Sequence, residues 1–168
     1  MKKLIYTIAI TLTTFAATAQ KLGHINTQKL LVSLPAYEQA KSELEVFAKE
    51  KQEEFMILRD MYQKKENKYI QLEQKCQADP TNCDKNLLQM EYTKVEESAE
   101  LLQQRQYEME AEIQEREGYL INKVVTTIKN AAEAVAKEKG ITYVLDYSTL
   151  IYAGGEDLNA AVKAKLAK

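Results

Sequence analysis

The sequence predicts an α+β protein that consists of one long antiparallel helical hairpin and a small body of short strands. Three observations support this fold class. Residues 36–76 and 84–139 contain a single glycine and no proline, as long helices do. The segment between them is rich in turn-forming residues. Both ends of the chain carry short runs that favour strands.

The composition excludes several classes of protein. With 5 glycines and 2 prolines in 168 residues, a β-sandwich with a turn every ten residues is not expected. Hydrophobic residues make up 45%, which is too many for a disordered chain. One histidine and two cysteines leave little for metal or nucleophile chemistry, and Gly154-Gly155 lacks the lysine of a phosphate-binding loop. We therefore expect no enzyme, no catalytic residues, no cofactor and no metal.

The first 19 residues have the pattern of a cleavable signal peptide. Lys2 and Lys3 precede an uncharged stretch from Leu4 to Ala16, and Ala17-Thr18-Ala19 has the small-x-small form of a cleavage site. The stretch is shorter than the roughly 20 apolar residues that span a bilayer. Cleavage would leave 149 residues with a formal charge of −4. We expect an exported, periplasmic protein; a buried N-terminal helix is the alternative.

After the signal peptide, a strand and a short helix are expected. Leu22–Asn26 has the pattern of a strand, and Asn26 or Thr27 is suited to cap a helix that carries Leu30 and Leu31. Pro35 is then suited to the first turn of the long helix. Residues 20–35 form the first part of the predicted body.

Residues 36–139 form the predicted arm, in which each helix carries one coiled-coil seam. The spacing of three and four residues predicts these seams, although several of the positions are polar. The first seam runs through Leu44, Phe47, Lys51, Phe55, Leu58, Tyr62, Lys65, Tyr69, Leu72 and Cys76. The second runs through Leu88, Glu91, Val95, Ser98, Leu102, Arg105, Met109, Ile113, Arg116, Leu120, Val124, Thr127, Ala131 and Val135. Such a narrow stripe predicts arms that are helical but flexible, loosest near the tip; a plain antiparallel coiled coil is the alternative.

Cys76 and Cys83 indicate where the hairpin turns. On one continuous helix they would lie about 10 Å apart along the axis, whereas a disulfide needs Cα atoms within about 7 Å. The turn-forming Asp79-Pro80 and Asn82 lie between them. In an exported protein two cysteines usually pair. We therefore expect a tip near residues 77–83 and a disulfide, with two free thiols as the alternative.

The remaining strands are expected in the C-terminal segment, residues 140–168. Gly140 is suited to end the second arm. Ile141–Tyr147 is rich in β-branched and aromatic residues and predicts a strand, and Leu150–Tyr152 predicts another. Asp157 is suited to cap a small helix over Leu158–Leu166.

Three short strands cannot hide their edges, and about 60 residues outside the arms are marginal for an independent core. A symmetric oligomer would solve both problems, with strands from several chains in one β-body. The residues expected in that body are Leu22, Ile25, Tyr143, Val144, Leu145, Tyr147, Ile151 and Tyr152.

The terminal segments resemble the Skp/OmpH family of periplasmic chaperones. The resemblance rests on Gly23-His24-Ile25-Asn26-Thr27-Gln28-Lys29, Leu34-Pro35-Ala36-Tyr37, Lys139-Gly140-Ile141-Thr142-Tyr143-Val144-Leu145-Asp146 and Ile151-Tyr152-Ala153. It implies a homotrimer with a shared β-body and three arms around a cavity. It also implies an ATP-independent holdase for unfolded outer-membrane proteins. The alternative is a non-catalytic coiled-coil structural or assembly protein of the cell envelope.

The charge of the arms departs from that family, whose members are often strongly basic. Residues 38–138 contain 15 Lys and Arg against 22 Asp and Glu, a net charge of −7. Binding to lipopolysaccharide or anionic membranes is therefore not expected, and nucleic-acid binding is disfavoured. Capture of clients should depend on apolar and tyrosine side chains, each of which could equally be ordinary seam packing. The candidates are Phe55, Met56, Tyr62, Tyr69 and Tyr107.

Overall fold

A computed structural model describes residues 20–167, so the predicted signal peptide lies outside the described residues. These residues form two compact units, one of residues 20–34 and 124–167 and the other of residues 35–123. The elements, in chain order, are β1 (Leu22–Ile25), α2 (Thr27–Val32), α3 (Pro35–Ala78), α4 (Lys85–Lys139), β2 (Tyr143–Asp146), the 3₁₀ helix η2 (Tyr147–Thr149), β3 (Glu156–Asp157) and α5 (Asn159–Leu166). None of the described helices has the length and apolar character needed to span a bilayer.

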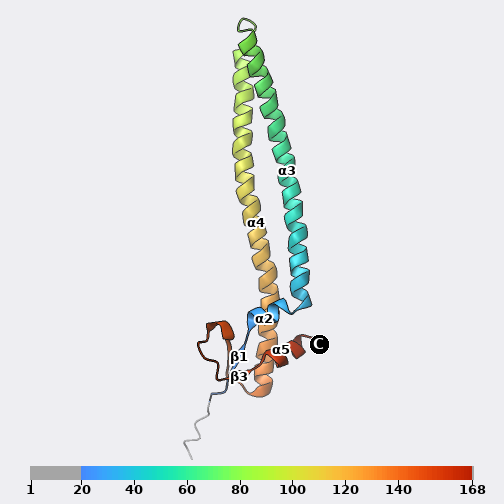
Figure 1. The fold of residues 1–168 in the computed structure, drawn as a ribbon, viewed down its shortest axis with the longest axis vertical. Coiled ribbons are helices and arrows are strands. Elements are labelled where there is room, and N and C mark those ends of the chain that lie inside the picture. The colour runs from blue at the N-terminus through green and yellow to red at the C-terminus, as the bar shows by residue number, and fades with distance from the viewer. Residues whose placement is uncertain (1–19, 168) are drawn as a thin grey trace, which may run out of the picture. The chain divides into compact units, whose positions relative to one another are not determined.

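The unit of residues 35–123 is a helical hairpin that contains most of the arm predicted over residues 36–139 (Figure 1). α3 is 44 residues long and begins at Pro35, where a missing N–H costs no hydrogen bond. α4 is 55 residues long and returns antiparallel beside it, continuing past residue 123 into the other unit. The long antiparallel hairpin expected from the sequence is thus confirmed.

The core of this hairpin is thin, as the polar seams predict. Every seam position from Leu44 to Cys76 on α3 and from Leu88 to Leu120 on α4 is buried or half-buried. Yet Ala40 is the single fully buried residue of α3. Further along α4 the seam prediction is wrong at Thr127, which is exposed, while Ile128 is completely buried. Residues 124–139 belong to the other unit, so their buried face follows the core of that unit.

In the unit of residues 20–34 and 124–167, strands from both ends of the chain form one parallel sheet. The order is β2-β1-β3, with β1 in the centre. Leu22 is opposite Tyr143, and Ile25 is opposite Asp146. This confirms a small sheet that combines N-terminal and C-terminal strands, although the observed β2 is shorter than the predicted strand Ile141–Tyr147.

The strand predicted at Leu150–Tyr152 is wrong. The Asp146 carboxylate accepts hydrogen bonds from the backbone N–H and the hydroxyl of Ser148, at 2.9 and 2.7 Å, so the chain turns into η2 directly after β2. Ile151 and Tyr152 then lie in an irregular segment with almost fully exposed side chains. The third strand is instead β3, which pairs with Gly23 and His24.

The ends of the helices in this unit follow from a few local residues. The Asn26 side chain accepts from the backbone N–H of Lys29 at 2.8 Å and caps α2, as predicted. Gly140, with φ of 64°, ends α4 in the left-handed conformation. The prediction that Asp157 caps the last helix is wrong, because the N-cap of α5 is Leu158 and no side chain caps that helix. The Asp157 carboxylate accepts instead from the backbone N–H of Asn159, the first residue of α5, at 2.8 Å.

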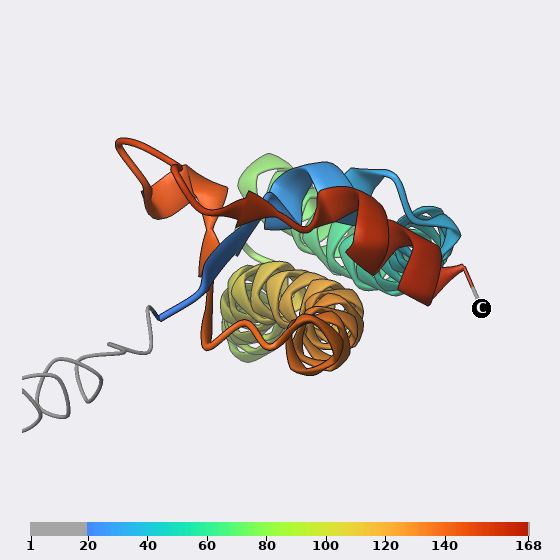
Figure 2. The same cartoon turned by 90° about the horizontal axis from the view of Figure 1, so that it is seen from below.

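The core of this unit lies between the C-terminal part of α4 and the short elements. α2 and α5 lie next to each other in both views (Figures 1 and 2), and the backbone N–H of Asn26 donates to Oδ1 of Asn159 at 2.8 Å. His24 is buried in β1, as expected of a structural residue. The buried apolar residues are Ile25, Leu30, Leu31, Val124, Ile128, Ala131, Ala132, Val135, Ala136, Ile141, Leu158 and Val162.

Candidate functional sites

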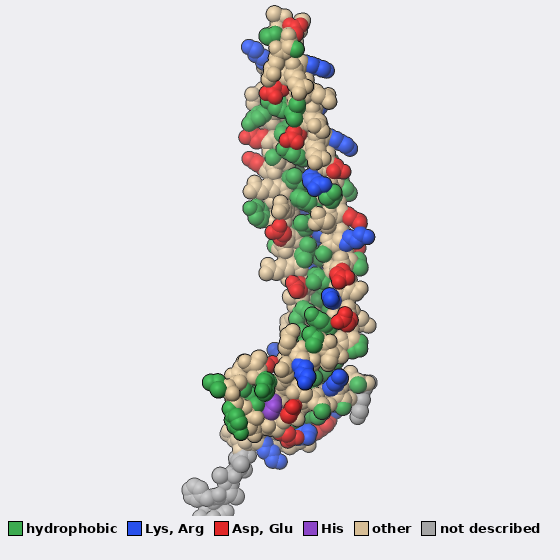
Figure 3. Space-filling model, viewed as in Figure 1, with side chains coloured by type: hydrophobic (Ala, Val, Ile, Leu, Met, Phe, Trp, Pro, Cys, Tyr) green, Lys and Arg blue, Asp and Glu red, His purple; other side chains and the backbone are tan. Residues whose placement is uncertain are grey.

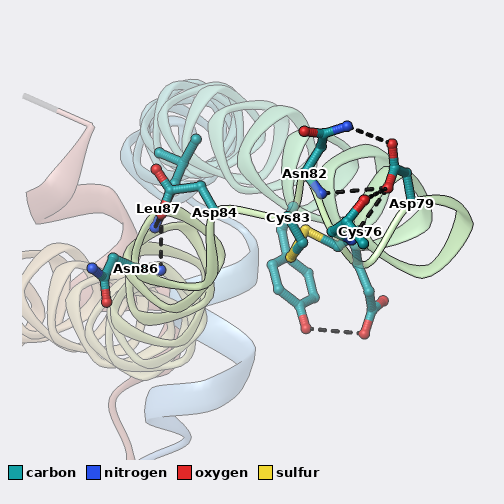
Figure 4. The surroundings of a disulfide bond; sticks show 10 residues. Cys76, Asp79, Asn82, Cys83, Asp84, Asn86 and Leu87 are labelled. Carbon is teal, nitrogen blue, oxygen red and sulfur yellow. Dashed lines mark hydrogen bonds between the residues drawn. A yellow bond between two sulfur atoms is a disulfide. The ribbon is translucent and has the colours of Figure 1, made fainter.

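The tip of the hairpin is closed by the Cys76–Cys83 disulfide, with Cα atoms 4.6 Å apart (Figure 4). The helices end on either side of it because α3 stops at Ala78, just before Asp79-Pro80. The chain therefore reverses direction between the two cysteines. Their spacing in the sequence allows a disulfide only with such a reversal, so the predicted pairing is confirmed.

Asp79 organises the turn itself. Its carboxylate accepts from the Thr81 hydroxyl at 2.6 Å and from the Asn82 amide at 2.7 Å, and these bonds lower the pKa of Asp79. Asp84 then accepts from the backbone N–H of Leu87 at 3.0 Å and caps α4 (Figure 4). The tip is thus a compact turn held by its own side chains.

Charged layers cross the seam of the arm. The amine of Lys65 donates to the buried Ser98 hydroxyl at 2.5 Å. The amine of Lys51 lies 2.8 Å from the carboxylate of Glu112, which raises the pKa of Lys51. Lysine side chains that interrupt the predicted seam therefore reach partners on the opposite helix.

The five predicted client contacts divide into two groups. Phe55, Tyr62 and Tyr69 are half-buried in the seam. The hydroxyls of Tyr62 and Tyr69 donate to glutamates one turn further along α3. Met56 and Tyr107 are exposed, Tyr107 by 64%. The structure thus brings the first group into the hairpin interior and leaves the second on its surface.

Exposed apolar side chains are spread along the arm rather than gathered in one patch. In the view of Figure 3, green side chains follow the hairpin between acidic and basic ones. The large exposed ones in this unit are Val46, Met56, Ile57, Met61, Ile70, Met90, Tyr92, Leu101, Tyr107 and Tyr119.

A groove around Phe47 was not predicted from the sequence. One hollow of about 310 Å³ and a second of about 470 Å³ share Phe47 and Arg116. The first is lined by Phe47, Glu112, Glu115, Arg116 and Tyr119, and the second by Gln39, Ser42, Glu43, Val46, Phe47, Glu50 and Arg116. We name these residues together the Phe47 groove. The helical spacing of Glu112, Glu115 and Tyr119 is a signal that could have indicated a shared face.

Arg116 lies at the centre of the Phe47 groove. Its guanidinium carbon is 5.7 Å from the centroids of both the Phe47 and the Tyr119 rings. Its Nη2 pairs with Glu43, and its buried Nε has no hydrogen-bond partner among the described residues. The Phe47 ring also lies near a second cation, because the amine of Lys51 is 5.5 Å from its centroid. The rings of this groove therefore already hold cations of the chain itself.

In the other unit, the outer edge of β2 is open. Among the described strands, β2 pairs with β1 alone. Side chains alternate along it, so Tyr143 and Leu145 are exposed while Val144 and Asp146 are half-buried. Of the other predicted body residues, Ile25 is buried, whereas Leu22, Tyr147, Ile151 and Tyr152 are exposed.

The described residues contain no group of three or more His, Cys, Asp or Glu side chains placed to hold a metal ion.

The sequence of the two terminal segments and the hairpin matches that of a known protein family. The profile of the family described as outer membrane protein (OmpH-like) matches residues 21–166. The chain belongs to the OmpH-like family. The match includes both terminal segments and the hairpin, and it confirms the resemblance found in the sequence.

The fold of this OmpH-like chain also matches a solved structure. A crystal structure from Caulobacter crescentus CB15, described as an OmpH-like outer membrane chaperone, superposes with a TM-score of 0.67. The sequences are 14% identical, and the match covers 90% of this chain and 86% of that chain. At this identity the likeness shows a shared fold. No curated protein sequence is significantly similar to the chain.

Proposed function

We propose that this OmpH-like protein is an ATP-independent holdase chaperone of the periplasm that binds unfolded outer-membrane proteins. Membership of the OmpH-like family and the likeness to a structure described as an outer membrane chaperone support a chaperone. In this proposal, residues 1–19 are a cleaved signal peptide, residues 20–35 and 140–168 form the body, and residues 36–139 form the arm. The protein has no catalytic activity and no cofactor.

The observation that carries the proposal is the distribution of exposed apolar side chains along the arm. Single exposed apolar side chains are common on protein surfaces, but ten large ones on one thin hairpin, three of them methionine, are typical of an adaptable binding surface more than of a plain spacer. Spread over two long helices among charged residues, they suit many weak contacts with an unfolded chain rather than one fixed partner. Met56 and Tyr107 are the proposed contacts that are already exposed, while Phe55, Tyr62 and Tyr69 would contact clients where the hairpin opens.

We further propose that the protein is a homotrimer whose arms surround a cavity. The open outer edge of β2 supports assembly, because an unpaired strand edge is a template for pairing with another chain. Tyr143 and Leu145, on the exposed face of β2, would pack against side chains of a strand that another copy adds to this edge. Ile151 and Tyr152 are exposed in the irregular segment after β2 and would add further contacts.

The proposal does not extend to lipid or nucleic acid. The arm carries a net charge of −7 over residues 38–138, which repels phosphate groups. The alternative function is a coiled-coil structural or assembly protein of the cell envelope, for which the long hairpin alone would suffice.

One preparation tests the proposal. The full chain is secreted by a host bacterium, its N-terminus is sequenced, and its mass is measured by light scattering after gel filtration. A urea-unfolded outer-membrane β-barrel protein is then diluted into it without ATP, and turbidity is followed.

The outcomes separate the hypotheses. An N-terminus at Gln20, a mass of three chains and suppressed aggregation at about one trimer per client would support the enclosing holdase. A trimer that leaves aggregation unchanged would favour the structural alternative. A monomer would overturn the shared β-body.

A further inference from the structure

We propose that the Phe47 groove binds segments of unfolded polypeptide that combine basic and aromatic side chains. This inference rests on the proposed chaperone function, to which it adds a binding site and a preference for one charge. It departs from capture by apolar contacts alone, because the groove offers carboxylates and ring faces together.

Two carboxylates of the groove are available to a ligand. Among the described residues, Glu50 and Glu115 form no ion pair, and both are exposed. By contrast, Glu43 pairs with Arg116, and Glu112 pairs with Lys51. A basic side chain entering the groove therefore meets Glu115 in one hollow and Glu50 in the other.

The aromatic rings favour the same ligand. Arg116 approaches the Tyr119 ring, but Tyr119 is 60% exposed, so the rest of its ring surface is open to a further cation or to another aromatic ring. Glu115 is one helical turn before Tyr119, which places a carboxylate beside that ring. Val46, 56% exposed, and Phe47 add apolar surface to the adjoining hollow.

Arg116 does not make the groove a site for anions. Its Nη2 is already engaged by Glu43, and its guanidinium carbon lies 5.7 Å from the centroid of each of the Phe47 and Tyr119 rings. The carboxylates that line both hollows would repel an incoming carboxylate. The role of Arg116 here is to position the two rings.

The wider charge of the arm acts in the same direction. Residues 91–117 of α4 contain nine acidic and three basic residues. Their field should attract basic segments and repel acidic ones, although screening over about 8 Å at physiological salt limits the reach of this effect. The field alone therefore does not select one binding position, and contacts inside the groove are needed for basic segments to bind there.

The test uses the secreted full chain and calorimetric titration. One short unstructured peptide alternates lysine and tyrosine with serine, and its counterpart has glutamate in place of every lysine. The groove variant is Glu50→Gln with Glu115→Gln. The matched control is Glu96→Gln with Glu97→Gln, which makes the same change in net charge at exposed α4 positions outside the groove. Circular dichroism checks that each variant remains helical.

We expect the lysine peptide to bind about three- to tenfold more weakly to the groove variant than to the wild type, because two exposed charge contacts are lost. The control variant should change binding less than about twofold, and the glutamate peptide should not bind. Tyr119→Ser should also weaken binding of the lysine peptide. Equal losses in both glutamine variants would overturn the site in favour of a general field, and binding of the glutamate peptide would overturn the charge preference.

The turbidity assay separates this inference from the proposed function. If the protein suppresses aggregation but the groove variant binds the lysine peptide as tightly as the wild type does, the groove site is refuted and the holdase function stands. Peptide binding in the groove by a protein that suppresses no aggregation would refute the holdase and leave the site intact.

Discussion

The amine of Lys68 on α3 lies 2.9 Å from Oε1 of Glu91 on α4, and the Glu91 side chain is only 4% exposed. Lys94 reaches the same oxygen at 2.9 Å from one turn further along α4. A nearly buried carboxylate thus takes two cations, one from each helix. Because an unpaired charge would be costly there, this layer favours one register of the hairpin over others.

The contribution of Glu91 to stability should depend on pH. Hydrogen bonds from Lys94 and Lys68 lower the pKa of Glu91. A carboxyl with a lowered pKa in the folded state stabilises fully above the unfolded pKa, and this contribution is lost as pH falls through the folded pKa. We expect Glu91→Gln to melt below the wild type by an amount that is constant down to about pH 5 and shrinks at lower pH. Thermal melting followed by circular dichroism measures this gap.

Glu96→Gln is the control for that experiment. Glu96 is exposed and forms no ion pair among the described residues, so its replacement should change the melting temperature little at any pH. A gap for Glu91→Gln that stays the same down to pH 3 would show that the ionised carboxylate is not responsible.

Loss of the Cys76–Cys83 disulfide should loosen the tip and leave the body unchanged. The cysteines are seven residues apart, and closing so short a loop removes about 2 kcal/mol of chain entropy from the unfolded state. In Cys76→Ser with Cys83→Ser, amide hydrogen exchange should accelerate near residues 72–88 but not near residues 124–136. Two reactive thiols in the native protein by thiol titration would contradict the pairing.

Alanine at two glycines should have opposite effects. Gly140 has a φ of 64°, a conformation that costs a residue with a Cβ about 1 kcal/mol, so Gly140→Ala should destabilise. Gly118 lies inside α4, and an added Cβ would meet no atom within 4 Å. Gly118→Ala should therefore stabilise by roughly 0.5–1 kcal/mol. Urea unfolding of both variants measures the two signs, and effects of the same sign would be incompatible with these backbone roles.

Substitution on the outer side of β2 should separate assembly from folding. Leu145 is 39% exposed, so Leu145→Asp should reduce the proposed trimer to single chains without loss of helical signal. Val144, a predicted body residue, is half-buried on the opposite face of β2, so Val144→Asp should disturb the fold as well as the assembly. Sedimentation velocity with circular dichroism distinguishes the two.

Val32→Asp serves as the matched control, because Val32 is an apolar residue of the same unit that is 50% exposed in α2. It should leave the mass unchanged. A Leu145→Asp protein that still sediments as three chains would rule out β2 as the assembly edge.

The sequence by itself determined the two long helices, their ends and the tip. These features depend on local chemistry. Within a helix, proline is tolerated only in the first turn, which is where Pro35 lies. Gly140 adopts the left-handed conformation that ends α4, and Asp79-Pro80 interrupts a helix. Helical periodicity also placed the seam correctly as far as Leu120.

The tertiary structure alone decided the third strand and the Phe47 groove. Glu156–Asp157 has little strand propensity, yet it forms β3 because the edge of β1 is beside it, as the bond from the Leu158 N–H to the His24 carbonyl at 3.0 Å shows. Leu150–Tyr152 has the propensity but no strand beside it. Periodicity placed both Phe47 and Arg116 on the seams, but it could not say which seam residues face each other, because the register of the hairpin decides that contact.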